Sequence, residues 1–237
     1  MNRFADWCRF PFAAESRLIR LFRRQIEAEN GHRLSLGATD ETHAGWISTS
    51  LSLVDPRDHR ALGRFFHRSS VDALLAERVW ERWTIQQGLD AAKNCFQYLK
   101  PGGYLRVAVA DGFHPSPTYL QRERESDQAH EIRSLYNYVS LGQLFEQAGF
   151  RCELIEYFDE EGNFHSNPWD VSKGLIQTSL LFDARNERAP YEYTSLILDA
   201  VKPDAKAMGF SNGNAAANVS LDEPTPSSYS PKQQDAA

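Results

Sequence analysis

The chain has 237 residues, of which 41% are hydrophobic and 24% are charged, as in an ordinary globular domain. Its net charge of −6 argues against a protein that binds nucleic acid through a basic face. The 3 cysteines are widely spaced and form neither a disulfide framework nor a metal-ligand pattern, which favours a reducing compartment. With no signal-peptide pattern and no apolar run of about 18 residues, we expect a cytoplasmic protein without stable membrane insertion.

Residues 1–32 predict a helical segment ahead of the main domain. Leu18, Phe22 and Ile26 recur at helical spacing with several arginines between them, and Asn30-Gly31 is a stop signal. Such a basic amphipathic helix could lie on a membrane surface or pack on the domain with its arginines in solvent. We favour packing, because acidic residues dilute the positive charge of the segment.

Residues 33–203 carry the signals of the main domain, and its first half alternates between apolar runs and helical spacing. Apolar runs predict strands at 33–36, 46–50, 71–76 and 104–110. The spacing over 54–66 predicts a helix. Thr84 is expected to cap a further helix that runs to about Leu99, where Lys100-Pro101-Gly102-Gly103 stops it.

The second half of the domain contains two long polar stretches. Residues 112–135 predict a lid or binding loop, and residues 159–190 form a similar excursion in which 175–182 could pair as a strand. Ser140 is expected to cap a helix over 141–148, and strands are expected at 151–158 and 193–201. The polar composition of 204–237 predicts a disordered tail.

This alternation predicts an α/β fold with a doubly wound, mostly parallel sheet. The final strand follows a long excursion with no clear crossover helix, which permits it to be antiparallel. Residues 38–44 are too few for a helical crossover between the first strand and Gly45. We therefore expect the first crossover to be reduced.

Several segments of the main domain form an ordered set of recognisable elements. One is the helix end and strand at 98–109, which reads Tyr-Leu-Lys-Pro-Gly-Gly-Tyr-Leu-Arg-Val-Ala-Val; the others lie at residues 34–39, 45–47, 70–82 and 144–158. Together they resemble the S-adenosylmethionine-dependent (class I) methyltransferases, and in particular a small bacterial subgroup of methyltransferase-like proteins, in which the element at 98–109 leads into the fifth strand. The resemblance covers roughly residues 33–202 and implies a Rossmann-like methyltransferase fold with an antiparallel last strand.

The resemblance also implies S-adenosylmethionine as the cofactor and places its site on five residues: Gly37, Thr39, Ser50, Glu77 and Arg78. The sequence departs from the family pattern at several of these positions. Thr39 stands where the family has a second glycine, and Ser50 stands where an acidic residue accepts hydrogen bonds from the ribose. Arg78 and Arg82 stand where the subgroup has histidines.

Asp111 and His114 are the candidate catalytic residues. They follow the strand expected at 104–110, and ligands of doubly wound sheets bind at the carboxyl ends of the strands. A carboxylate and an imidazole there could serve as an acid–base pair. Alternatively, Asp111 caps the turn through Gly112, and His114 is a loop histidine held between two turns. No ligand pattern for a metal is present in the sequence.

Two functions follow from these patterns. The first is methyl transfer from S-adenosylmethionine to a small-molecule or sugar-like acceptor. The alternative is a catalytically inactive, methyltransferase-like binding or regulatory module with a protein partner, motivated by the joint changes at Thr39, Ser50, Arg78 and Arg82. The two arginines could also hold a carboxylate or phosphate.

The two functions predict different crevices at the ends of the strands. An open crevice at Gly37, Ser50 and Glu77 would favour the enzyme. A crevice filled by one of three large side chains would favour the module; the candidates are Trp46, Arg78 and Trp80.

Overall fold

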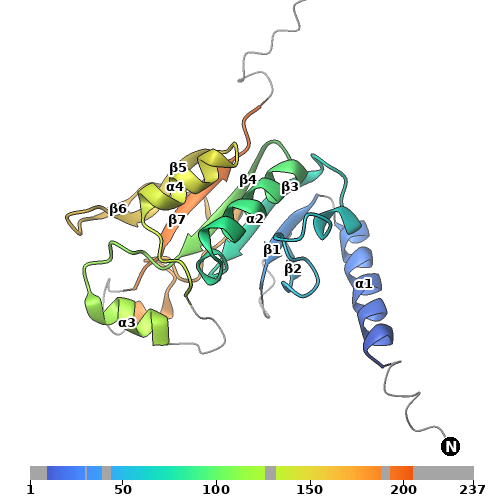
Figure 1. Ribbon diagram of the computed structural model, residues 1–237, viewed down its shortest axis with the longest axis horizontal. Helices are drawn as coiled ribbons and strands as arrows, with labels where there is room; N and C mark the ends of the chain where they lie inside the picture. Colours follow the sequence, from blue (N-terminus) through green and yellow to red (C-terminus); the bar gives the residue numbers. More distant parts are fainter. Residues whose placement is uncertain (1–9, 30, 39–43, 126–131, 188–192, 205–237) are drawn as a thin grey trace, which may run out of the picture.

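The computed structural model describes residues 10–29, 31–38, 44–125, 132–187 and 193–204. A seven-stranded sheet of order β2-β1-β3-β4-β7-β5-β6 forms its centre (Figure 1). The strands are β1 (Arg33–Leu36), β2 (Ile47–Thr49), β3 (Val71–Glu77), β4 (Leu99–Val109), β5 (Arg151–Phe158), β6 (Phe164–Ser166) and β7 (Leu196–Val201). β2, β1, β3 and β4 are parallel, whereas β7 runs antiparallel between β4 and β5. The predicted α/β sheet with an antiparallel last strand is therefore confirmed.

The order of the strands reverses at β1, because β2 lies on one side of it and β3 on the other. Such a reversal is where doubly wound sheets open a crevice at the carboxyl ends of their strands. The described residues of the connection from β1 to β2, 37–38 and 44–46, form turns and contain no helix. This agrees with the predicted reduction of the first crossover.

Two helices, α2 (Ile85–Tyr98) and α4 (Tyr138–Gln147), lie side by side on one face of the sheet (Figure 1). Thr84 caps α2 as predicted, in a capping box with Gln87. The predicted cap of α4 is wrong, since the helix begins after Asn137, whose side chain accepts a hydrogen bond from the amide of Ser140. Ser140 occupies position N3 of this capping box, and its hydroxyl accepts in return from the amide of Asn137.

The opposite face of the sheet is covered by irregular chain from the 159–190 excursion. Trp169 and Ile176 pack there against side chains of the sheet, among them Leu75, Ile155 and Ile197. The strand predicted over 175–182 is wrong, because this segment forms turns and β6 lies earlier, at Phe164–Ser166. The backbone amides of residues 177, 178 and 180 donate hydrogen bonds to carboxylates of the sheet and not to a neighbouring strand.

The helix predicted over 54–66 is also wrong. Only Leu62–Arg64 form a short 3-10 helix, and the residues before it form turns. The side chains of Asp55 and Asp58 accept hydrogen bonds from backbone amides two residues further on, which stabilises turns in place of a helix. The apolar positions that produced the pattern, such as Val54 and Leu62, are nevertheless buried.

The lid or loop expected over 112–135 contains a helix, α3 (Pro117–Glu125). Ser116 precedes it, and its hydroxyl accepts a hydrogen bond from the amide of Tyr119 at 3.3 Å. A serine followed by a proline is a common helix start, so the sequence held a local signal that the charged composition obscured.

The N-terminal helix α1 (Phe10–Ala28) packs on the domain through Phe22 and the partly buried Ile26. Phe22 is buried and meets the ring of Phe65 edge to face, with 4.8 Å between the ring centroids. Leu18 and Leu21 on the same helix are exposed. No helix in the described part of the chain is long and apolar enough to cross a membrane.

One buried arginine ties the irregular cover to the sheet. Arg106 on β4 is 1% exposed and donates to both carboxylate oxygens of Asp199 on β7, each at 2.8 Å. It also donates to the carbonyls of Asp170 and Gly174, at 3.1 and 2.7 Å, and lies over the ring of Trp169. Every part of this guanidinium is therefore paired within the protein.

Replacing Arg106 should destabilise the fold strongly. Arg106→Met removes the partner of a largely buried carboxylate, a change that typically costs about 3–5 kcal/mol. We expect the free energy of unfolding in urea to fall by about that amount. Adding Asp199→Leu to Arg106→Met should recover part of the loss, since no charge is then left unpaired. A loss of less than about 1 kcal/mol would contradict this account.

Candidate functional site

A pocket of about 470 Å³ opens beyond the carboxyl end of β3. It lies between the loop after β3, the helix α3 and the segment 177–185. Its walls are formed by Arg78, Glu81, Arg82, Glu123, Gln177, Thr178, Phe182, Asp183, Ala184 and Arg185. Most of these side chains are charged, so we expect charged or polar groups of a ligand to make the main contacts in this pocket.

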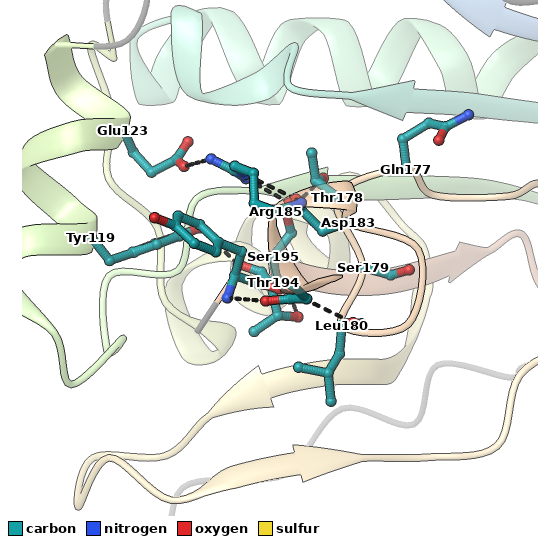
Figure 2. Close-up of polar contacts among 12 residues, drawn as sticks. Tyr119, Glu123, Gln177, Thr178, Ser179, Leu180, Asp183, Arg185, Thr194 and Ser195 are labelled. Atoms are coloured by element: carbon teal, nitrogen blue, oxygen red, sulfur yellow. Dashed lines mark hydrogen bonds and ion pairs between the residues drawn. The ribbon is translucent and has the colours of Figure 1, made fainter. Parts of the chain in front are cut away.

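A chain of ion pairs crosses the pocket. Arg78 Nε lies 3.0 Å from Glu81, and its Nη2 bonds to Glu123 on α3. The second oxygen of Glu123 accepts from Arg185 at 2.8 Å, and Arg185 also contacts Asp183 at 2.6 Å. Figure 2 shows Arg185 lying between Glu123 and Asp183. These bonds hold α3 and the 177–185 segment together above the end of β3.

The backbone at Arg78 turns sharply as the chain leaves β3. Its φ of 57° lies in the left-handed region, which is uncommon for a residue other than glycine. Its amide donates to the carbonyl of Ala108 on β4 at 2.9 Å. This turn directs the chain toward Glu81 and Arg82 at the pocket wall.

Glu77, predicted as a cofactor contact, is used within the protein. Its carboxylate accepts from the amides of Gln177 and Thr178 at 3.1 and 2.6 Å, and from the hydroxyl of Thr178 at 2.8 Å. The end of β3 is therefore bonded to the segment that covers the second face of the sheet. No oxygen of Glu77 is without a protein donor.

Gly37 and Ser50, two other predicted cofactor residues, do not line this pocket. Gly37 has a φ of 71°, and a Cβ there would lie 2.9 Å from a methyl group of Val79. Ser50 is exposed, bonds to the hydroxyl of Ser52 at 2.8 Å, and lines a separate groove between α1 and β2. Thr39 lies outside the described residues.

The predicted catalytic pair is buried and lies outside the pocket lining. One carboxylate oxygen of Asp111 accepts from the amide of Phe113 at 2.9 Å, and the other accepts from the amide of Phe158 at 2.8 Å. The ring of His114 stacks on Tyr119 at 3.8 Å, and its Nδ1 accepts from the amide of Ser116 at 3.1 Å. In this arrangement both side chains organise the loop after β4.

Of the large side chains that could fill the crevice, Arg78 is the one in the pocket wall. Trp46 packs on the opposite face of the sheet, and Trp80 is fully buried with its indole donating to the carbonyl of Gly88 at 3.2 Å. Of the residues that line the pocket, only Arg78 and Arg82 were singled out from the sequence; Glu81, Glu123 and Arg185 are among those that were not. Glu81 had a local signal, three positions after Arg78, whereas Glu123 and Arg185 meet only through the tertiary fold.

Burial shifts the pKa values of two neighbouring groups on the pocket wall, Glu81 and Arg82. It raises the pKa of the Glu81 carboxyl, against the effect of nearby Arg78, and leaves its Oε2 without a hydrogen-bond partner. Burial also lowers the pKa of the half-buried Arg82, whose Nε has no acceptor. One acceptor and one donor are thus unsatisfied on neighbouring residues.

Comparison with known proteins gives no family model and no curated protein that matches this chain. Solved structures do resemble it. A SAM-dependent methyltransferase from Archaeoglobus fulgidus is 13% identical, with 79% of this chain and 94% of that chain covered and a TM-score of 0.43. A possible histamine N-methyltransferase from Thermotoga maritima is 12% identical, with 81% and 97% covered and a TM-score of 0.42.

A third structure, phosphoethanolamine N-methyltransferase 2 from Haemonchus contortus with S-adenosylmethionine, is 13% identical, with 74% and 50% covered and a TM-score of 0.42. The order and direction of the strands in this chain define a doubly wound, Rossmann-like fold in which β7 is antiparallel.

Replacing Asp111 should affect stability before it affects any chemistry. Asp111→Asn presents an NH₂ group to one of two backbone amides that now donate to carboxylate oxygens. We expect the free energy of unfolding to fall by about 1–3 kcal/mol. Equal stability of the variant and the original protein in urea titrations would show that these hydrogen bonds are not needed.

The same residue predicts a pH dependence. Burial raises the pKa of Asp111 to about 6, in spite of the hydrogen bonds from Phe158 and Phe113, which lower it. Between about pH 4 and pH 6 the folded protein then holds a proton that the unfolded chain has lost, so the contribution of Asp111 to stability declines as pH rises. The difference in unfolding free energy between the original protein and Asp111→Asn should therefore narrow over this range. A difference that widens would contradict the raised pKa.

Proposed function

We propose that this protein is a methyltransferase-like binding or regulatory module that does not transfer methyl groups. One observation carries the proposal: the residues that the resemblance places beside the cofactor after β3 are bonded within the protein. Glu77 is bonded to residues 177 and 178, and Arg78 to Glu81 and Glu123. A cofactor contact at either residue would have to replace these bonds.

The remaining described residues also fit S-adenosylmethionine poorly. The space on the Cβ side of Gly37 is filled by side chains of Val79 and Leu51. Ser50 supplies one hydroxyl and no charge where the ribose would need a carboxylate acceptor.

Methyl transfer from S-adenosylmethionine to a small-molecule or sugar-like acceptor is the second candidate, and the strand order favours it. Asp111 and His114 would then act as the acid–base pair. That role would require the loop after β4 to open, because both side chains are buried and hydrogen-bonded. Arg78 would also have to leave Glu123.

Calorimetric titration with S-adenosylmethionine and S-adenosylhomocysteine separates the two candidates. For a module without the cofactor we expect no heat of binding and no shift in the unfolding temperature up to millimolar ligand. Micromolar binding, together with transfer of a labelled methyl group to any small acceptor, would overturn the proposal.

Two serine variants locate any binding that is seen. Ser50→Ala removes the hydroxyl at the predicted ribose position, and Ser52→Ala removes its hydrogen-bond partner while leaving Ser50 in place. If the nucleoside binds at the end of β2, only Ser50→Ala should weaken it. Equal affinities for both variants would place the ligand elsewhere.

A further inference from the structure

We propose that the pocket beyond β3 binds a small organic anion, with a carboxylate or phosphate on the Arg82 guanidinium and a flat apolar group against Phe182. This inference deepens the proposed function and rests on it, because it names the ligand class of the binding module. Arg82 and Phe182 both belong to the pocket wall.

Arg82 is the guanidinium of the pocket wall that forms no hydrogen bond or ion pair in the described structure, although the neighbouring carboxylate of Glu81 attracts its charge. Of the guanidinium groups that line the pocket, Arg78 is paired with Glu81 and Glu123, and Arg185 with Glu123 and Asp183. The Nε of Arg82 is buried. An unpaired, partly buried charge is costly, and a guanidinium binds carboxylate or phosphate in a two-bond geometry.

The residue next to Arg82 carries an unsatisfied acceptor. Glu81 is 2% exposed, and its Oε2 has no donor in the described structure. Buried polar atoms are nearly always paired, so an unpaired one at a pocket wall indicates a missing partner.

Part of the pocket wall is apolar. Phe182 is 40% exposed, although its ring meets Trp169 edge to face at 6.2 Å. A pocket of about 470 Å³ accommodates a molecule of metabolite size. A ring placed against Phe182 would remove this exposed aromatic surface from water.

The test uses the full chain and four simple probes: benzoate, phenyl phosphate, acetate and inorganic phosphate, with benzyl alcohol as the neutral comparison. We expect benzoate or phenyl phosphate to bind at least about tenfold more tightly than benzyl alcohol in NMR titrations. The tighter of the two identifies the anionic group. The ring-free anions should bind more weakly than their ring-bearing counterparts.

Variants assign the contacts. Arg82→Gln should weaken the ring-bearing anions by at least about tenfold, and Arg82→Lys by less, because it keeps the charge and loses the two-bond geometry. Phe182→Leu should weaken the ring-bearing probes and leave acetate and phosphate unchanged. Arg151→Gln is the matched control, because Arg151 is an exposed arginine paired with Glu153 on β5, and it should change nothing.

Three outcomes would overturn the inference: no binding of any probe to folded protein, equal binding by the original protein and Arg82→Gln, or an equal effect of Arg151→Gln. Failure of the proposed function looks different. It would appear as micromolar binding of S-adenosylmethionine with methyl transfer, whether or not the anions bind.

Discussion

The buried pairing of Arg106 with Asp199 is the constraint on which the second face of the sheet depends. A charged side chain in the middle of a sheet is stable only if all its donors are satisfied away from water. Asp199 satisfies two of them, and the carbonyls of Asp170 and Gly174 satisfy others. The irregular chain after β6 must therefore cross this face at a fixed place.

Two carboxylates continue the attachment toward the pocket. Glu77 at the end of β3 accepts hydrogen bonds from the amides of residues 177 and 178. Glu156 on β5 accepts from the amide of Leu180 and the hydroxyl of Thr194, and both of these residues are labelled in Figure 2. These bonds replace the strand ladder that the segment would otherwise need. They also position Phe182, Asp183 and Arg185 at the pocket, so the cover of the sheet and the wall of the site are one structure.

Much of this fold could be predicted from the sequence because its signals are local. Apolar runs located every strand of the sheet except β6, and Thr84 located the start of α2. The errors arose where side chains compete with the backbone, as at Asp55 and Asp58, which form turns within an apolar spacing that resembles a helix.

The site was harder to predict, since its contacts join distant parts of the chain. The sequence placed Glu77 and Arg78 at the crevice, but it could not show that both side chains would bond to other residues of the protein. Their partners Thr178 and Glu123 come from segments without any local pattern that points to them. Asp111 and His114 were placed correctly after the strand, while their burial followed from packing against Phe158 and Tyr119.

These bonded partners lie far apart along the chain, and this separation affects the order in which the protein folds. Thr178 bonds to a residue 101 positions earlier, and Asp199 to one 93 positions earlier. Contacts at such separations close large loops and form late, after the local helices and neighbouring parallel strands. The pocket therefore takes shape only when the last strand has entered the sheet, and a chain shortened before β7 would lose the site as well as the strand.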